Sequence, residues 1–232
     1  MAKRCTTPRA CCIDQRAPKS ADKVGPWPAL SFAKKTVCEY GYMMQIKETR
    51  LPEVLILTPA RHGDARGFFS ESWNAQTLAA AGIHHHFVQD NHSLSKAANT
   101  LRGLHFQTPP HAQTKLVRCG RGALYDVAVD IRHGSPNFGK WVGVELSFEN
   151  GHQLLIPAGF MHGFITRAPM TEIIYKCTDI YAPECDAAVR WDDPALNIDW
   201  GLEGKTPILS DKDAKAPLLS EHAAHFTWES TA

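Results

Sequence analysis

The sequence has no marked excess of charge of either sign, and it has no long apolar runs. Its 232 residues carry 25 Lys and Arg against 24 Asp and Glu, a net charge of +1. Such a balance gives no general attraction to nucleic acid or anionic membranes, so we expect neither as a partner. The longest apolar runs, such as Val54–Thr58, are far too short to span a bilayer. A hydrophobic share of 44% nevertheless excludes a disordered chain and suits one large domain, or at most two small ones.

Cysteine is scarce in most of the chain. Residues 43–232 contain only Cys119, Cys177 and Cys185, an odd number with no C-x-x-C spacing. This pattern argues against a disulfide framework and against a structural zinc site. A reducing, cytoplasmic location fits it best.

The first 42 residues differ from the rest. They hold the other four cysteines and a net charge of +5, which leaves −4 for residues 43–232. They show no apolar periodicity and no continuous apolar core of a secretory signal. A basic start could indicate an organelle transit peptide, but Asp14, Asp22 and the scattered prolines argue against one. We expect residues 1–42 to be a disordered extension, or sequence upstream of a natural start at Met43 or Met44, and residues 43–232 to form one domain.

From residue 54 onward, short β-rich runs alternate with Gly- and Pro-containing turns, which is typical of a sandwich or barrel. Helices are predicted over Asn74–Ala81, with Asn74 as N-cap and Gly82 as stop, and over Asp211–Leu219. The predicted strands are Val54–Leu57, Phe68–Trp73, His86–Gln89, Leu101–Gln107, Lys115–Cys119, Ala123–Ile131, Trp141–Phe148, Gln153–Ile156, Gly163–Thr166 and Thr171–Tyr181.

One stretch resembles a cupin motif. Gly151–Thr166 follows the pattern G-x5-P-x-G-x2-H-x3-N, with Thr166 in place of Asn. The other cupin motif should supply metal ligands, but Gly103–Gln107 lacks its second His, and Lys115 stands where an acid is wanted. A cation beside neutral ligands makes a poor divalent-metal site. We therefore expect an all-β, cupin-type jelly-roll barrel with one or two short peripheral helices and no metal.

A series of collinear segments makes the family recognisable. The chain resembles the dTDP-4-dehydrorhamnose 3,5-epimerase family from Met44 to about Leu219. The resemblance implies a jelly-roll fold, a homodimer and no metal or organic cofactor. It rests on Gly63–Glu71, Phe87–Ser93, Leu101–Gln107, Lys115–Arg118, Asp126–Arg132, Ser135–Gly139, Ile156–Phe164, Tyr175-Lys176 and Leu209–Asp213.

The residue types also suit the chemistry. Epimerising a 4-keto sugar requires a base, an acid on the opposite face of the ring and a cation for the developing enolate oxygen. His105 would be the base, Tyr175 the acid and Lys115 the cation. By resemblance Asp213 would orient His105, with Asp126 as second choice.

The resemblance also assigns residues to a dTDP-4-keto-6-deoxy-hexose substrate. Arginine and lysine suit its diphosphate, so Arg66 and Arg102 are candidates, assisted by Lys212. In the family the arginine that matches Arg66 comes from the partner subunit. At the position of Asp186 the family usually has Glu, so the side chain here keeps the charge but is shorter. The candidates are Arg66, Glu71, Gln89, Asn91, Arg102, His162, Tyr181, Asp186 and Lys212.

Other interpretations remain open from sequence. Taken singly, His105, Tyr175 and Lys115 are each better explained by a structural role, as a buried histidine, a strand tyrosine and a surface lysine. Together with the collinear segments, the catalytic roles are favoured. Relatives on the same scaffold epimerise only C3 or C5, or are ketoisomerases. A non-catalytic sugar-binding cupin and a metal-dependent cupin oxygenase are the alternatives from other classes.

Overall fold

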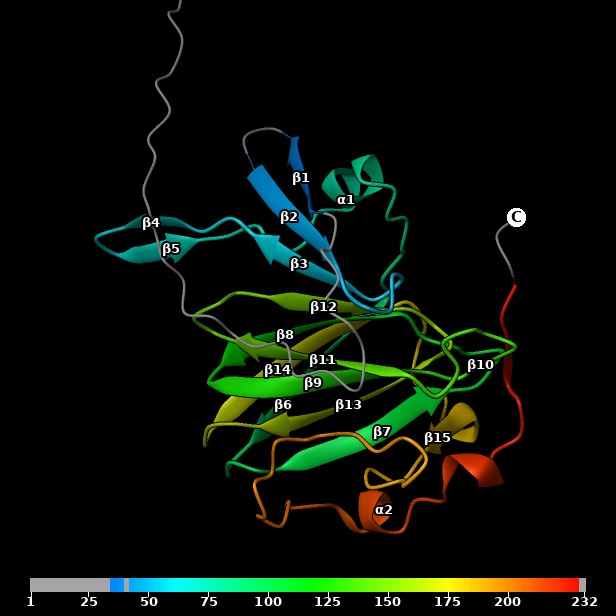
Figure 1. Ribbon diagram of the computed structural model, residues 1–232. Coiled ribbons are helices and arrows are strands. Elements are labelled where there is room, and N and C mark those ends of the chain that lie inside the picture. The colour runs from blue at the N-terminus through cyan, green and yellow to red at the C-terminus, as the bar shows by residue number, and fades with distance from the viewer. Residues whose placement is uncertain (1–33, 40–41, 230–232) are drawn as a thin grey trace, which may run out of the picture.

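The computed structural model describes residues 34–39 and 42–229, which form β-strands with two short α-helices (Figure 1). The all-β prediction is confirmed. The strands are β1 Lys34–Glu39, β2 Tyr42–Glu48, β3 Leu55–Pro59, β4 His62–Asp64, β5 Gly67–Phe69, β6 Gln89–Ser95, β7 Leu101–Gln107, β8 Lys115–Arg121, β9 Ala123–Asp130, β10 Arg132–His133, β11 Trp141–Ser147, β12 Gln153–Ile156, β13 Phe160–Thr166, β14 Thr171–Cys177, β15 Asp186–Ala188 and β16 Phe226–Thr227. The helices are α1 Ala75–Ala80 and α2 Asp211–Ala214, with 3-10 turns at Pro183–Cys185 and Leu219–Glu221.

Two sheets make up the jelly roll. One has seven strands in the order β1-β2-β3-β12-β8-β14-β6, and the other has five in the order β11-β9-β13-β7-β15. Val117 and Ile173 of the first sheet share a buried apolar cluster with Ala128 and Phe164 of the second, so this cluster is the core between them. Because side chains alternate along a strand, residues two apart from these also face inward.

The outer faces of both sheets are covered as well. Helix α1 supplies Leu78 to a cluster with Ile46 and Leu116 of the seven-stranded sheet. The segment between β15 and α2 supplies Leu196 and Trp200 to a cluster on the outer face of the five-stranded sheet. No helix in the described ranges is long and apolar enough to cross a membrane.

The local predictions were partly correct. Asn74 caps α1 as predicted, since its side chain accepts hydrogen bonds from the N–H groups of Gln76 and Thr77. The second helix was predicted too long: α2 ends at Ala214. Pro217 explains this, because it has no N–H to donate and disfavours helix at the residue before it.

Several strand boundaries also differ from the predicted ones. The predicted strand Phe68–Trp73 is only Gly67–Phe69, paired with β4 in a separate hairpin, and the one predicted at His86–Gln89 begins at Gln89. Strand β1 pairs with β2 inside the predicted N-terminal extension, so ordered structure begins earlier than residue 43. Residues 1–33 lie outside the described residues, and the expectation for them stays a prediction.

A close approach of β7 and β13 sets the geometry around the inward-facing histidines. Gly103 has φ +122°, and a Cβ there would lie 2.6 Å from Cα of Gly163. The strands' register shifts between His162 and Phe164 at this point. Glycine is therefore required at position 103 by both conformation and space.

Replacing Gly103 with Ala is expected to lower the free energy of unfolding by about 2–4 kcal/mol, because strain and a backbone clash add. Denaturant titration would measure this. Gly134→Ala is the matched control, since Gly134 also has positive φ, +84°, but no heavy atom within 4 Å of the added Cβ. Its loss should be only about 1–2 kcal/mol. Equal losses in both variants would contradict a role for the close approach.

Candidate active site

Lys115 and Tyr175 lie on the inner face of the seven-stranded sheet. In the β8–β14 register Tyr175 stands opposite Val117, and Lys115 stands opposite Cys177. Val117 belongs to the core between the sheets, and Tyr175 packs against that core. Lys115 and Cys177 are each two residues away on the same strands, so all three polar side chains share the inner face.

Strand β6 adds two of the predicted substrate ligands to this face. Asn91 stands opposite Tyr175, and Gln89 stands opposite Cys177. The Asn91 amide lies 3.6 Å from Sγ of Cys177, and the Gln89 amide donates to Asn91 at 3.1 Å. The structure thus brings Gln89, Asn91, Lys115 and Tyr175 together, as the sequence predicted.

The five-stranded sheet presents two histidines toward them. His105 on β7 and His162 on β13 are register partners. His162 is buried, and its Nε2 lies 2.6 Å from Oδ1 of Asp126 on β9. Oδ2 of Asp126 is buried without a hydrogen-bond partner among the described residues. In the described part of the chain no three or more His, Cys, Asp or Glu side chains are grouped so as to hold a metal ion.

His105 forms a second His–Asp pair, and it crosses from β7 to α2. Nε2 of His105 lies 2.6 Å from Oδ1 of Asp213, whose side chain is only 3% exposed against 30% for His105. Burial raises the pKa of Asp213, but hydrogen bonds from His105, Ser210 and the Gly103 backbone outweigh it and hold that pKa below its usual value. Asp213 is therefore an anion at neutral pH, aimed at one ring nitrogen of His105.

Burial also changes the pKa of both groups on the opposite sheet. It lowers the pKa of the Lys115 ammonium, an effect that Cys177, Asp186 and Asp126 partly offset. It raises the pKa of the Tyr175 phenol, assisted by Cys177 and opposed by Arg102. Tyr175 therefore keeps its proton at neutral pH and is available as a donor.

The loop after β14 gathers three more of the predicted ligands. The Tyr181 N–H donates to the Gln89 side chain at 2.8 Å, and its hydroxyl lies 3.3 Å from Oδ2 of Asp186. The Lys212 ammonium donates to the same Asp186 oxygen. Tyr181 is 56% exposed, so its ring is accessible to a planar partner. Despite its short reach, Asp186 ties this loop to α2.

Arg102 reaches from β7 across to β6 of the other sheet. Its guanidinium lies 3.4 Å from Oγ of Ser95 and 3.4 Å from the Leu94 carbonyl. These long contacts leave most of its donors for another acceptor. Arg102 is therefore placed to bind an anion, and its charge acts on Tyr175, whose pKa it lowers.

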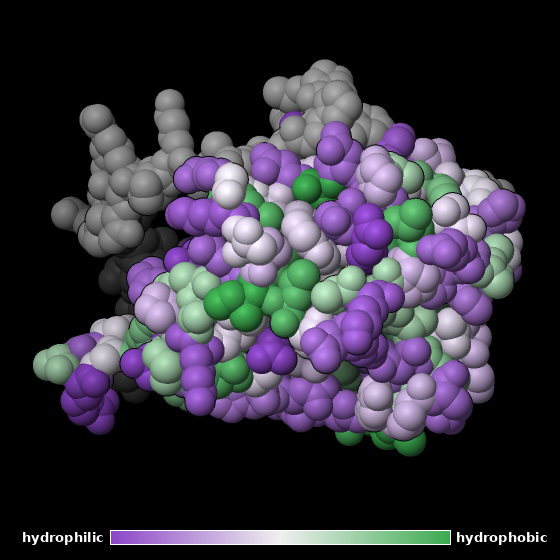
Figure 2. Space-filling view, turned by 90° about the horizontal axis from the view of Figure 1, so that it is seen from below, coloured by the Kyte–Doolittle hydropathy of each residue, from purple (hydrophilic) through white to green (hydrophobic). Residues whose placement is uncertain are grey.

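The structure does not bring Arg66 or Glu71 into this group. Arg66 lies at the tip of the β4–β5 hairpin, which projects away from the two sheets (Figures 1 and 2). Its side chain is 90% exposed and pairs with Asp64 of the same hairpin at 2.6 Å. Glu71 lies half-buried between β5 and α1.

Figure 2 shows hydrophobic side chains gathered within a polar surface on the face seen from below.

Comparison with known proteins identifies the family. The sequence profile of dTDP-4-dehydrorhamnose 3,5-epimerase matches residues 48–221. The enzyme of that name from Salmonella typhimurium is 53% identical over 77% of this chain and 97% of its own length. The chain belongs to the dTDP-4-dehydrorhamnose 3,5-epimerase family. It is an isomerase with the cupin fold of that family.

Solved structures agree. A Legionella pneumophila dTDP-6-deoxy-D-glucose-3,5-epimerase, in complex with dTDP-4-keto-L-rhamnose, superposes with a TM-score of 0.77 at 47% identity, covering 81% of this chain and 100% of its own. A 3′-monoepimerase from Streptomyces bikiniensis, in complex with dTDP-quinovose, gives 0.70 at 33% identity, covering 75% and 87%. The chain is thus similar to both double and single epimerases.

The structure pairs His105 with Asp213, the partner that the resemblance implied, and not with the second choice. Asp126 was the second choice to orient His105, but it pairs with His162 instead. The reason is the β9–β13 register, which places Asp126 opposite Phe164, two residues from His162. A buried acid in the apolar strand Ala123–Asp130 signalled a partner, but the strand order that selects it is not readable from one sequence.

Two residues of this site were missed altogether. Cys177 contacts Asn91 and stands opposite Lys115, although it was counted only as a free thiol. Gln107 is buried; its amide donates to the carbonyls of His111 and Ile180 and accepts from the Ala182 N–H. It thereby holds the loop that carries Tyr181. The available signal for Gln107 was its position in the motif, where a cupin would have its second histidine ligand.

Proposed function

We propose that this chain converts dTDP-4-dehydro-6-deoxy-D-glucose to dTDP-4-dehydro-L-rhamnose by moving protons at C3 and C5. One observation carries the proposal: His105, which is paired with Asp213 of α2, lies on the inner face of one sheet, and Tyr175 and Lys115 lie on the inner face of the other. A base and an acid on opposite walls are what inversion of a carbon next to a ketone requires.

The contacts support a role for each group. Asp213 accepts a hydrogen bond from Nε2 of His105, so Nε2 carries the proton and Nδ1 is the base. Nδ1 removes the proton at C3 or C5, and the electron pair moves onto O4 as an enolate. The Lys115 ammonium stabilises that oxygen, and Tyr175 returns a proton to the opposite face of the carbon. Arg102 and Lys212 bind the diphosphate, and Tyr181 stacks on the base.

Proton NMR of the substrate with the purified protein in heavy water tests the proposal. Loss of both the C3 and C5 proton signals is expected, together with product that a coupled rhamnose synthase consumes. Loss of one signal would make the protein a single-site epimerase, the second candidate that its likeness to the Streptomyces bikiniensis monoepimerase favours. Retention of both signals would point to a ketoisomerase or a sugar-binding cupin.

The alkaline limb of the pH–rate profile should report Lys115. Only the protonated amine stabilises the enolate, so activity falls as pH rises through the lowered pKa of Lys115, at a pH below the value of about 10.4 for an exposed lysine. Tyr175, whose pKa is raised, loses its proton later. In Lys115→Arg the guanidinium stays charged, so the limb should move to higher pH although kcat is reduced.

Lys176→Arg is the matched control for this shift. Lys176 neighbours Tyr175 on β14 but pairs with Asp90 at 3.0 Å on the outer face of the sheet. Its replacement should leave the limb in place. A limb that moves equally in both variants, or in neither, would remove Lys115 from the ionisation that governs kcat.

We further infer that the active unit is a homodimer in which the β4–β5 hairpin of one subunit reaches the site of the other. The hairpin exposes Phe68 and Phe69, 46% and 59% respectively, an uncommon surface for a monomer. Its base is anchored, since the Arg61 guanidinium lies 4.4 Å from the Phe68 ring and 5.3 Å from the Phe148 ring. Arg66 at the tip would then meet the partner's bound diphosphate.

Mixed dimers test this arrangement. Arg66→Ala and His105→Ala homodimers should each be nearly inactive at low substrate concentration. After exchange of subunits, half of the dimers pair one variant with the other, and one of their two sites combines an intact His105 with an intact Arg66. About a quarter of the wild-type activity should return. No recovery after proven exchange would place Arg66 outside the partner's site.

We also propose a cytoplasmic location. Cys119, Cys177 and Cys185 are buried as free thiols. Cys177 lies within the proposed site, so a reducing compartment would protect it from oxidation.

A further inference from the structure

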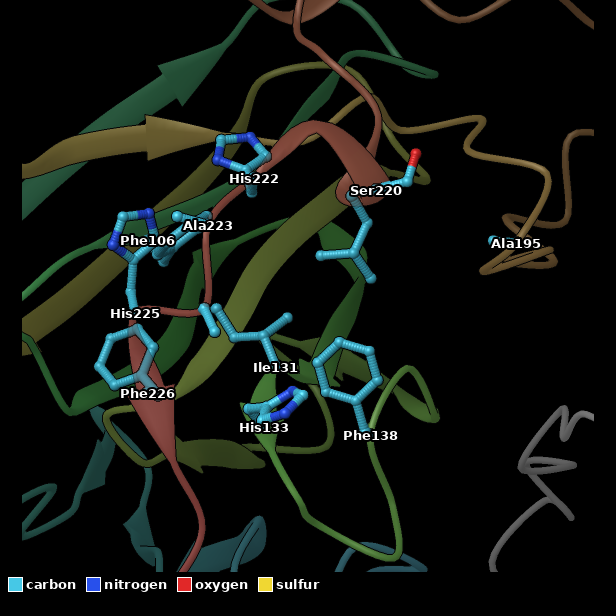
Figure 3. A pocket seen from close by; sticks show the side chains of 12 residues that line it. Phe106, Ile131, His133, Phe138, Ala195, Ser220, His222, Ala223, His225 and Phe226 are labelled. Carbon is cyan, nitrogen blue, oxygen red and sulfur yellow. The ribbon is translucent and has the colours of Figure 1, made fainter.

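A cavity of about 420 Å³ lies on the outer face of the five-stranded sheet, beneath residues 219–228, which we call the C-terminal segment. The side chains of Phe106, Ile131, Phe138 and Phe226 form much of its lining (Figure 3). Phe106 follows His105 directly on β7, so the two side chains point to opposite faces of the sheet. The cavity is therefore separate from the proposed active site and backs onto it through one strand.

The C-terminal segment forms one wall of this cavity and is fixed at both ends. Strand β16 pairs with β10, where Phe226 stands beside Arg132, and the Trp228 N–H donates to the His133 carbonyl at 2.9 Å. Earlier in the segment, Nε2 of His222 lies 2.9 Å from the Ala188 carbonyl. The wall thus lies mostly beyond residue 221, where the family match ends.

The polar part of the lining is dominated by three imidazoles. His133, His222 and His225 come from two separate segments, and Figure 3 shows their rings spread around the cavity. His222 must donate through Nε2, because its partner is a carbonyl, and this leaves Nδ1 uncommitted. The imidazoles of His133 and His225 have no hydrogen-bond partner among the described residues.

Charge complementarity selects the kind of ligand. The twelve lining residues include no Asp, Glu, Lys or Arg, so the histidines are the only ionisable groups there. Imidazoles can donate to a carboxylate or sulfonate, and no lining carboxylate would repel it. The aromatic walls suit a flat ring, and the volume lies within the range of about 300–1,000 Å³ typical of small-molecule sites.

We propose that this cavity is a second ligand site, which takes a small planar aromatic acid. The aromatic rings of Phe106, Phe138 and Phe226 hold the ring system of the ligand, and His133 and His225 bind its acidic group. The site is independent of the dTDP-sugar reaction, so its test does not depend on the catalytic assignment.

The probe is 1-anilinonaphthalene-8-sulfonate, an aromatic sulfonate whose fluorescence rises on binding. It is titrated into the full chain with dTDP at saturating concentration, which blocks the nucleotide site. We expect one equivalent per chain to bind. The neutral analogue N-phenyl-1-naphthylamine should bind at least about tenfold more weakly, because it lacks the acidic group.

Variants distinguish specific binding of the sulfonate from nonspecific hydrophobic binding. His133→Ala/His225→Ala should raise the Kd of the sulfonate at least about tenfold, and Phe138→Ala, in an exposed loop, should weaken both probes. His84→Ala/His86→Ala removes two exposed histidines elsewhere and should change nothing. The proposal is overturned if dTDP abolishes binding, if the His133/His225 variant binds like wild type, or if the neutral probe binds as tightly as the sulfonate.

Discussion

His105→Ala is expected to lower kcat about 10³-fold and to stop exchange of both the C3 and C5 protons, because the variant has no base. The barrel should remain folded. His105 is 30% exposed and lies at the inner face, and within the described ranges its ring makes one hydrogen bond, to Asp213. Loss of exchange would be followed by proton NMR in heavy water, and folding by circular dichroism and thermal unfolding.

The control for this variant is His92→Ala. His92 lies on β6, is 58% exposed and pairs with Glu172 on the outer face of the sheet at 3.2 Å. It should exchange substrate protons at the wild-type rate. Unchanged turnover in His105→Ala would remove His105 as the base and leave His162, with its own carboxylate, as the alternative.

Removal of the base also tests what Asp213 contributes. Asp213 is almost fully buried, and the hydrogen bonds that hold its pKa low come partly from His105. Without the imidazole the carboxylate would be left with Ser210 and the Gly103 backbone, and its pKa should rise. Some loss of stability is therefore expected in His105→Ala above about pH 4, where the carboxylate of an unfolded chain is ionised. The loss should shrink as pH falls through the folded pKa of Asp213.

Much of this site was predictable because its residues stand in motifs that are local in sequence. The spacing around Pro157 and Gly159 resembles a cupin motif, and His162 indeed lies on the barrel strand that follows this turn. The strand Thr171–Cys177 carries Tyr175, where the resemblance implied an acid. Alternation along β8 and β14 then places Lys115 and Tyr175 on one face. These inferences need only strand periodicity and family resemblance.

The rest depends on contacts between distant segments, which one sequence does not encode in readable form. Asp126 was kept as a second choice for His105, and its pairing with His162 instead is decided by the order of β9, β13 and β7 within the sheet. Gln107 supports a loop more than seventy residues away, through the carbonyl of Ile180. The cavity beneath residues 222–228 arises only once β16 has paired with β10.

Tyr175→Phe is expected to separate removal of the proton from its return. His105 and Asp213 are untouched, so abstraction should continue, and deuterium from the solvent should still enter the substrate from the His105 side. Delivery to the opposite face lacks its donor, so formation of the epimerised product should fall about 10²–10³-fold. The ratio of exchange to product, measured by NMR and by the coupled rhamnose synthase, should therefore rise.

Burial makes Tyr175 suited to this role, since it raises the pKa of the phenol and keeps the proton in place until the enolate forms. Tyr125→Phe is the control: it removes the hydroxyl of a buried tyrosine on β9 whose ring belongs to the outer apolar cluster of the five-stranded sheet. That variant should keep the wild-type ratio of exchange to product. Normal exchange and normal product yield in Tyr175→Phe would instead mean that another donor returns the proton. Water entering beside Lys115 would then be the first group to test, since the Lys115 ammonium on the adjoining strand can hold it next to the enolate.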